Sequence, residues 1–158
     1  MATPFRLLFV CLGNICRSPA AEGVMRALVE REGCDHVEID SAGTAGWHSD
    51  KLPDERMRQA ARARGLDLSS RARQVMPDDL STFDLVVAMD ESNRRDLRAL
   101  DPESMHAAKI RLLCDFCTEH DLREVPDPYY GGPEGFEQVL NLLEDGCAGL
   151  LAEIRRSR

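Results

Sequence analysis

The chain contains no apolar run long enough to cross a membrane, which takes about 20 residues. Its apolar stretch at residues 5–10 is too short for the hydrophobic region of a signal peptide, and neither a basic leader nor a small-residue cleavage site accompanies it. The sequence therefore predicts a cytoplasmic protein without a membrane partner.

Cysteine is too sparse for a disulfide framework. The six cysteines are Cys11, Cys16, Cys34, Cys114, Cys117 and Cys147. Cys114 and Cys117 have the spacing of zinc and redox sites, but they lack a second ligand pair and follow an apolar run instead of opening a helix. We interpret both as buried structural cysteines. The histidines show no ligand spacing either, so no metal site is predicted and no role is assigned to His36, His48, His106 or His120.

Basic residues are outnumbered, with 20 Lys and Arg against 28 Asp and Glu and a formal net charge of −8. This balance argues against nucleic acid and anionic membranes as partners. It does not exclude a phosphorylated ligand, because the local field of a binding loop decides whether an anion binds.

Strand-like and helix-like segments alternate along the chain, without a linker, an internal repeat or a low-complexity tract. Strands are expected at residues 7–10, 37–41, 85–89 and 110–113, and helices at 20–31, 54–64, 91–100 and 135–156. This alternation predicts an α/β fold with a parallel sheet and helices on both faces. We expect one domain over residues 1–158.

One ten-residue segment carries most of the functional information: Val10-Cys11-Leu12-Gly13-Asn14-Ile15-Cys16-Arg17-Ser18-Pro19. It joins a predicted strand to a predicted helix, so that unpaired backbone N–H groups and a helix dipole meet at an anion site. Cys11 supplies a nucleophile whose thiolate this field stabilises, and the Arg17 guanidinium can hold two phosphoryl oxygens.

The other loop residues suit a tight phosphate cradle. Gly13 lets backbone N–H groups approach a ligand, and Asn14 tolerates left-handed geometry while its amide braces the loop. Ser18 is expected either to cap the helix or to donate a hydrogen bond to the sulfur of Cys11.

The segment resembles the signature of the low-molecular-weight protein tyrosine phosphatases. Further similar segments are Asp40-Ser41-Ala42-Gly43-Thr44, Ala72-Arg73-Gln74-Val75, Met89-Asp90-Glu91-Ser92-Asn93 and Asp127-Pro128-Tyr129-Tyr130. The resemblance runs from about Leu7 to the C-terminus. It implies a four-stranded sheet of flavodoxin-like strand order, a phosphocysteine mechanism without metal or organic cofactor, and a phosphotyrosine-containing protein as substrate. Phosphate, sulfate and vanadate are the expected site ligands.

Asp127 is the candidate proton donor for the leaving oxygen, since a tyrosine phenol has a pKa near 10. The flanking prolines restrict its backbone, although Asp-Pro is also an ordinary turn initiator. The resemblance selects the catalytic interpretation, because the family's general acid is the aspartate of this Asp-Pro-Tyr motif.

The remaining site residues are assigned to the pocket and its support. We expect substrate contacts from Leu12, Gly13, Asn14, Ile15, Cys16, Ser18, Trp47, Tyr129 and Tyr130. A lone tryptophan such as Trp47 is often core filler instead. Ser41 and Asp90 are expected to hydrogen-bond behind the loop.

Two features leave alternatives open. Cys16 shares the loop with Cys11, and the resemblance implies a reversible protective disulfide between them, whereas the plainer interpretation is a small buried side chain. Relatives carry a histidine before the Ala-Arg-Gln segment, but this chain has Ser70-Arg71 there. That departure leaves the hydrogen bonding behind the loop undetermined.

Three rival functions fit the sequence less well. An arsenate reductase on this scaffold needs relay cysteines within residues 84–95, where the chain has none. A phosphoarginine phosphatase has threonine at the position of Ile15. A phosphocarrier would gain nothing from Asp127, and a phosphate-binding module would not need a thiol directed at the anion.

Overall fold

A computed structural model describes residues 3–157, and a single parallel sheet organises them. The strands are β1 (Phe5–Cys11), β2 (Val37–Gly43), β3 (Leu85–Ala88) and β4 (Ile110–Leu112), in the order β2-β1-β3-β4. The predicted four-stranded parallel sheet and its flavodoxin-like order are confirmed.

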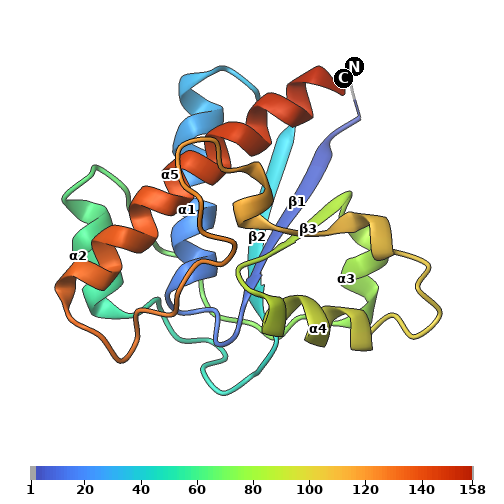
Figure 1. Ribbon diagram of the computed structural model, residues 1–158, viewed down its shortest axis with the longest axis horizontal. Coiled ribbons are helices and arrows are strands. Elements are labelled where there is room, and N and C mark those ends of the chain that lie inside the picture. The colour runs from blue at the N-terminus through green and yellow to red at the C-terminus, as the bar shows by residue number, and fades with distance from the viewer. Residues whose placement is uncertain (1–2, 158) are drawn as a thin grey trace.

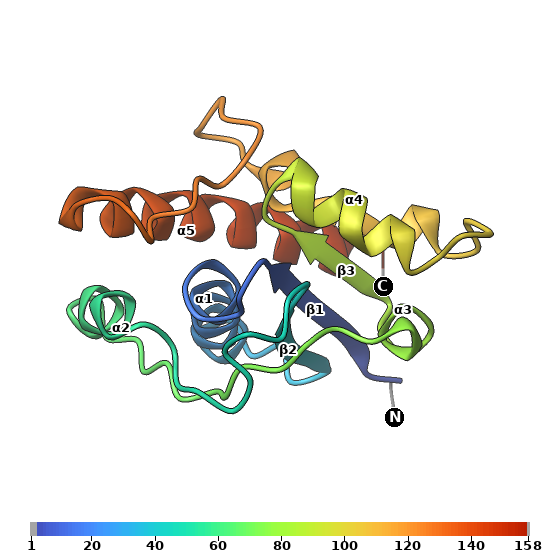
Figure 2. The same cartoon turned by 90° about the horizontal axis from the view of Figure 1, so that it is seen from below.

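Helices cover both faces of the sheet (Figures 1 and 2). They are α1 (Arg17–Arg31), α2 (Glu55–Arg62), α3 (Pro77–Thr82), α4 (Glu91–Ala99) and α5 (Pro133–Arg156), with 3₁₀ turns η1 (Ala107–Lys109) and η2 (Leu113–Phe116). Helices α1 and α5 pack together on one face, and α3 and α4 lie on the other. Helix α2 packs against α5 beyond the sheet.

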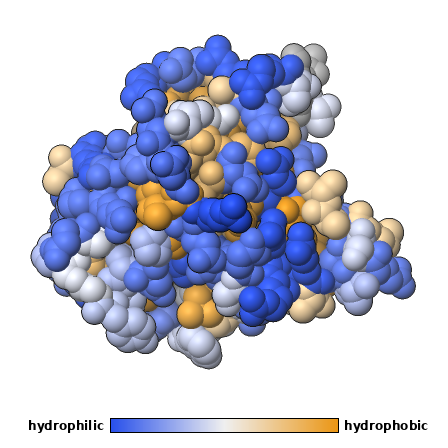
Figure 3. Space-filling view, viewed as in Figure 1, coloured by the Kyte–Doolittle hydropathy of each residue, from blue (hydrophilic) through white to orange (hydrophobic). Residues whose placement is uncertain are grey.

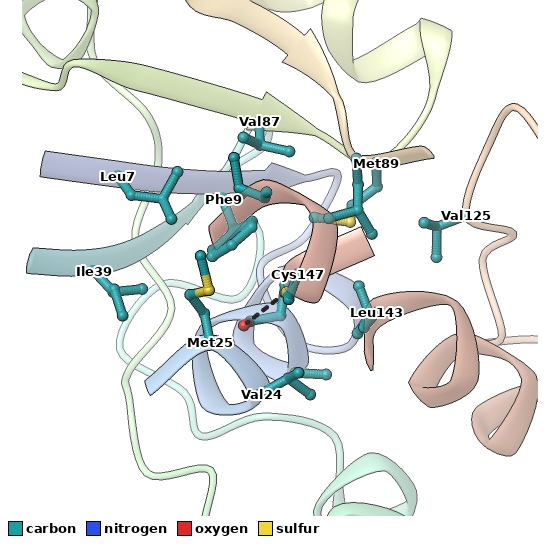
Figure 4. Packing of buried hydrophobic residues seen from close by; sticks show 14 of the residues in the cluster. Leu7, Phe9, Val24, Met25, Ile39, Val87, Met89, Val125, Leu143 and Cys147 are labelled. Atoms are coloured by element: carbon teal, nitrogen blue, oxygen red, sulfur yellow. Dashed lines mark hydrogen bonds between the residues drawn. The ribbon is translucent and has the colours of Figure 1, made fainter. Parts of the chain in front are cut away.

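The central strand β1 divides the core in two. Leu7 and Phe9 face the α1–α5 cluster, whereas the alternate residues Leu8 and Val10 face the cluster that includes α3 and α4. Figure 4 shows the first cluster, in which the Cys147 thiol contacts the carbonyl oxygen of Ala21 at 3.9 Å. Complete burial raises the pKa of Cys147, so this cysteine behaves as an apolar core residue.

Several element boundaries differ from the expected ones: β3 ends at Ala88 and not at residue 89, and α5 begins at Pro133 and not at residue 135. Helix α1 begins at Arg17 and not at residue 20, with Cys16 at its N-cap, so Ser18 is not the capping residue. Helix α3 was not predicted, because it has only six residues and one buried side chain, Leu80. Residue 113 belongs to η2 and not to β4.

The loops that follow β1, β2 and β3 meet at the carboxyl edge of the sheet, the lower edge in Figure 1. Ligands of open α/β sheets bind at such an edge. The face seen in Figure 3 is mainly hydrophilic. Among residues 3–157, no helix has the length and apolar character that crossing a membrane requires.

Candidate active site

The carbonyl groups of Cys11 and of the loop between β1 and α1, residues 12–16, accept hydrogen bonds from neighbouring segments. Neighbouring backbone N–H groups donate to them: Thr44 to Cys11 at 2.9 Å, Ala45 to Leu12 at 2.9 Å and Asp54 to Ile15 at 2.7 Å. By contrast, none of the hydrogen bonds found within residues 3–157 is donated by the backbone N–H groups of residues 13–16. The loop therefore presents several backbone donors to a ligand.

Two backbone features allow this loop. Asn14 has a φ of 57°, in the left-handed region that asparagine tolerates better than most residues. Gly43 lies so close that a Cβ atom there would stand 2.7 Å from the oxygen of Leu12 and 3.0 Å from the nitrogen of Asn14. The end of β2 thus supports the loop only because residue 43 has no side chain.

A layer of polar side chains lies behind the loop. The Asn14 amide nitrogen donates to Ser18 at 2.8 Å and to Ser41 at 3.0 Å, and its amide oxygen accepts the backbone N–H of Arg73 at 3.0 Å. The Ser18 hydroxyl lies 3.0 Å from the sulfur of Cys11. Asn14 and Ser18 are buried and do not line the pocket, so their side chains brace the nucleophile instead of lining the ligand cavity.

Arg17 is 2% exposed and is fixed by one of its nitrogens. Nη1 donates to Asp90 at 2.7 Å and to the carbonyl oxygen of Val125 at 3.0 Å, while Nη2 lies 3.7 Å from the Asp127 carboxylate. Burial alone would lower the pKa of Arg17, but the negative charges of Cys11 and Asp90 raise it above its ordinary value. Arg17 therefore stays cationic beside Cys11.

Asp90 connects this arginine to the end of β3. Its other carboxylate oxygen accepts the backbone N–H of Asn93 at 2.8 Å and caps α4. One carboxylate therefore fixes both a helix terminus and the guanidinium.

The segment 126–132, called the lip below, rests on α2. The Arg56 guanidinium carbon lies 5.3 Å from the ring centroid of Tyr129 and 4.9 Å from that of Phe136, and Arg56 is also paired with Asp54 at 3.0 Å. The backbone N–H of Tyr129 donates to Asp127 at 3.1 Å. Arg56 carries no sequence signal of its own, and only the fold brings it to the lip.

A cavity of about 290 Å³ opens over the loop, and the predicted substrate contacts line it, except for Asn14 and Ser18. Its lining comprises Cys11, Leu12, Gly13, Ile15, Cys16, Arg17, Trp47, His48, Asp127, Tyr129 and Tyr130. Trp47 is 72% and Tyr130 91% exposed, so Trp47 is a pocket wall and not core filler. The tyrosine rings meet edge to face, with centroids 5.0 Å apart.

His48 is the lining residue that the sequence analysis missed. It packs on the loop, since a Cβ atom added at Gly13 would stand 3.0 Å from its Cδ2 atom. Its place next to Trp47 was the one available signal.

The other cysteines differ in surroundings. Burial, followed by the charge of Asp54, raises the pKa of Cys16 and keeps it a neutral thiol beside Cys11. Cys114 is buried and Cys117 half-buried, and the Cys117 thiol lies 3.7 Å from the carbonyl oxygen of Leu142. The hydrogen bond between this pair lowers the pKa of Cys114 and raises that of Cys117. Within residues 3–157, no group of three His, Cys, Asp or Glu residues is placed to hold a metal ion.

Comparison with known proteins agrees with this geometry. The sequence profile of the low molecular weight phosphotyrosine protein phosphatases matches residues 6–158. The chain belongs to this family. A low molecular weight protein-tyrosine-phosphatase of Streptomyces coelicolor is 48% identical over 155 residues, which cover 96% of this chain and 94% of the relative. The resemblance inferred from the loop is thus confirmed, and the chain is a protein tyrosine phosphatase.

Solved structures show the same fold. A protein tyrosine phosphatase of Entamoeba histolytica, with Hepes in its active site, superimposes with a TM-score of 0.94 at 43% identity, covering 97% of this chain and 98% of that one. A Drosophila arginine phosphatase superimposes with a TM-score of 0.88 at 30% identity, covering 94% and 96%. The scaffold alone therefore does not distinguish phosphotyrosine from phosphoarginine.

Proposed function

We propose that this phosphatase hydrolyses phosphotyrosine in proteins through a phosphocysteine intermediate, with Cys11 as nucleophile, Arg17 as phosphoryl anchor and Asp127 as general acid and base. The observation that carries the proposal is the convergence of these three side chains on one cavity, above a loop whose backbone N–H groups have no acceptor among residues 3–157.

In the first step the Cys11 thiolate attacks phosphorus, forming the S–P bond while the bond to the ester oxygen breaks. The loop N–H groups and the free edge of Arg17 stabilise the charge on the three equatorial oxygens. Asp127 gives its proton to the departing phenol oxygen. No metal or organic cofactor takes part.

In the second step water attacks the phosphorus of phosphocysteine. The Asp127 carboxylate accepts a proton from this water, the S–P bond breaks, and phosphate leaves as the thiolate is regenerated. The position of Asp127 supports this role. Its carboxylate lies 3.7 Å from Nη2 of Arg17, and its side chain is 40% exposed and lines the cavity.

We favour phosphotyrosine over phosphoarginine because of Ile15 and the aromatic walls. Ile15 offers an apolar surface to an aryl ester and has no hydroxyl to orient a water molecule. Trp47, Tyr129 and Tyr130 surround the entrance and suit stacking on a phenol ring.

We further propose that Cys16 protects Cys11 by forming a reversible disulfide after oxidation. Both cysteines line the same cavity. Peroxide converts the Cys11 thiolate to a sulfenic acid, and the Cys16 sulfur then displaces water to give the S–S bond. A Cys16→Ala variant treated with peroxide should stay inactive after added thiol, whereas the wild type recovers.

The proposed function is tested by hydrolysis of an aryl phosphate and of a phosphotyrosine peptide as a function of pH, without added metal. We expect vanadate-sensitive turnover with an acidic optimum, since Asp127 must start protonated. Cys11→Ser should have no measurable turnover, and Asp127→Asn should lose about 10²–10⁴-fold.

Asp121→Asn is the matched control, because it removes an exposed carboxylate shortly before the lip and should keep full turnover. Turnover of phosphoarginine with no turnover of aryl phosphate would overturn the substrate assignment. Normal rates in Asp127→Asn would remove Asp127 from the mechanism.

A further inference from the structure

We propose that Glu22, paired with Arg26, is a positioning residue that fixes the direction of the hydrogen bonds behind Cys11, so that Ser18 donates to the sulfur. This inference rests on the proposed role of Cys11 as nucleophile. It concerns a buried charge that the mechanism above does not use.

Glu22 lies on α1, one turn beyond the catalytic loop, and is only 4% exposed. One carboxylate oxygen stands 2.6 Å from the Ser41 hydroxyl. The other accepts two hydrogen bonds from Arg26, at 3.0 Å from Nε and 2.7 Å from Nη2. Burying a carboxylate is costly unless it is paired, and this pairing leaves Ser41 as its contact toward the active site.

The carboxylate determines which way Ser41 points its hydrogen. An ionised carboxylate only accepts hydrogen bonds, so the Ser41 hydroxyl must donate to Glu22. The Ser41 oxygen is then an acceptor, and the Asn14 amide nitrogen donates to it at 3.0 Å. Glu22 thus makes Ser41 an acceptor on the side that faces the loop.

Asn14 connects the orientation of the Ser41 hydroxyl to that of the Ser18 hydroxyl. Its amide oxygen is held by the Arg73 backbone N–H, so the amide nitrogen must face both serines. The Ser18 oxygen accepts the second amide hydrogen at 2.8 Å, which leaves the hydroxyl hydrogen of Ser18 for another acceptor. Its two choices are the Cys11 sulfur at 3.0 Å and the Ala42 carbonyl oxygen at 3.3 Å, and a thiolate is the stronger acceptor.

Arg26 and Glu22 line a cavity of about 340 Å³ together with Ser70. No hydrogen bond within residues 3–157 joins Ser70 to Glu22 or Asn14. The guanidinium of Arg26 also donates to the Ile39 carbonyl oxygen at 2.7 Å, which anchors it to β2.

The experiment measures the rate of alkylation of Cys11 by iodoacetamide as a function of pH. Whether Glu22→Gln raises or lowers this rate distinguishes a positioning role from the effect of a negative charge alone. The charged and titratable groups that face Cys11 in its cavity are Arg17, Asp127, Cys16 and His48, and all of them stay in place. If Glu22 acted only as a negative charge, Glu22→Gln would favour the thiolate and speed alkylation at acidic pH. If it positions Ser18, we expect alkylation at acidic pH to slow by about three- to tenfold, from a weakened hydrogen bond to a charged acceptor.

A double-mutant cycle shows whether the effect passes through Ser18. Ser18→Ala should slow alkylation at least as much as Glu22→Gln, and adding Glu22→Gln to Ser18→Ala should produce no further slowing. Glu30→Gln, on the exposed side of the same helix, should match the wild type. Thermal melting identifies any variant whose fold is lost, and the Arg26→Gln variant, which keeps the carboxylate, then provides a second way to loosen the network.

Unchanged or faster alkylation in Glu22→Gln would overturn the proposal. It would also be overturned if Glu22→Gln slowed alkylation by the same factor in the wild type and in the Ser18→Ala variant. Alkylation of the wild type that leaves turnover intact would instead contradict the role of Cys11 itself. The two failures are therefore distinguishable.

Discussion

The catalytic loop and the lip face each other across one cavity but are built in opposite ways. Cys11, Arg17 and Ser18 are between 0% and 3% exposed, whereas Tyr130 is 91% exposed on the other side. Three backbone hydrogen bonds tie Cys11 and the loop to the segment after β2 and to the N-cap residue of α2. In the proposed mechanism the groups that meet the phosphoryl charge are therefore buried and bonded before a ligand arrives, and the groups that meet the ester side remain accessible.

The difference follows from what each region must do. Stabilising charge in a transition state requires donors that do not reorganise, and burial with satisfied partners provides this. Under the proposed function a phosphotyrosine side chain meets aromatic surface at the entrance, where the Arg56 guanidinium stacks on the Tyr129 ring. Substitutions in the loop and of Asp127 should thus lower kcat, and substitutions of the aromatic residues of the lip should raise KM.

After Cys11→Ser and Asp127→Asn, the largest expected effect is that of Arg17→Lys. Lysine keeps the charge but loses the planar fork that reaches Asp90, the Val125 carbonyl and the phosphoryl oxygens together. We expect kcat/KM for an aryl phosphate to fall by about 10²–10³-fold, the usual cost of removing a donor to a developing oxyanion. Inhibition by vanadate should weaken in parallel. A variant that keeps both its kcat/KM and its inhibition by vanadate would contradict the role of Arg17 as phosphoryl anchor.

The second effect comes from Asn14 and concerns the stability of the loop. Asn14→Ala removes three hydrogen bonds and places alanine at a φ of 57°, so urea unfolding should show a loss of about 2–4 kcal/mol in the free energy of unfolding. Asn14→Gly is the matched control, because it tolerates the backbone angle but lacks the amide. Equal stability of the two variants would show that the strained backbone contributes little.

A third region, around Asp145 and outside the lining of the cavity, should affect stability alone. Burial would raise the pKa of Asp145, but hydrogen bonds from the backbone of Thr118 and from His120 lower it to about 2. Because the folded-state pKa lies below the ordinary value, this stabilisation is present above about pH 4 and is lost as the pH falls toward 2.

Asp145→Asn should therefore lower the free energy of unfolding at pH 7 by about 1–2 kcal/mol and flatten its decline between pH 4 and 2. Chemical unfolding across this pH range provides the measurement. Turnover of an aryl phosphate should be unchanged, and a large loss of turnover would show that the region is coupled to the site.

The smallest effect is expected at the lip. Tyr130→Ala should raise KM for a phosphotyrosine peptide about two- to tenfold, the value of one aromatic contact, while kcat and the melting temperature stay the same. Inorganic phosphate as a competitive inhibitor is the control, since it lacks the aryl group. A two- to tenfold fall in kcat would show that Tyr130 also positions Asp127.

The amino-acid sequence by itself determined the alternation of strands and helices, and with it the parallel sheet. It also predicts the loop chemistry, because the residues suited to bind an anion between a strand and a helix are contiguous in the chain. The local motif of Asp127 allows a turn or a catalytic role, and the resemblance selects the catalytic role. These features depend on neighbours within a few positions, which a sequence displays directly.

Only the tertiary structure decided the contacts between distant segments. It placed His48 over Gly13, Arg56 under Tyr129, and the buried Glu22 between Arg26 and Ser41. It also showed that the side chains of Asn14 and Ser18 lie behind the loop. Such pairings depend on how helices pack on the sheet, and the direction of a side chain follows from that packing and not from spacing along the chain.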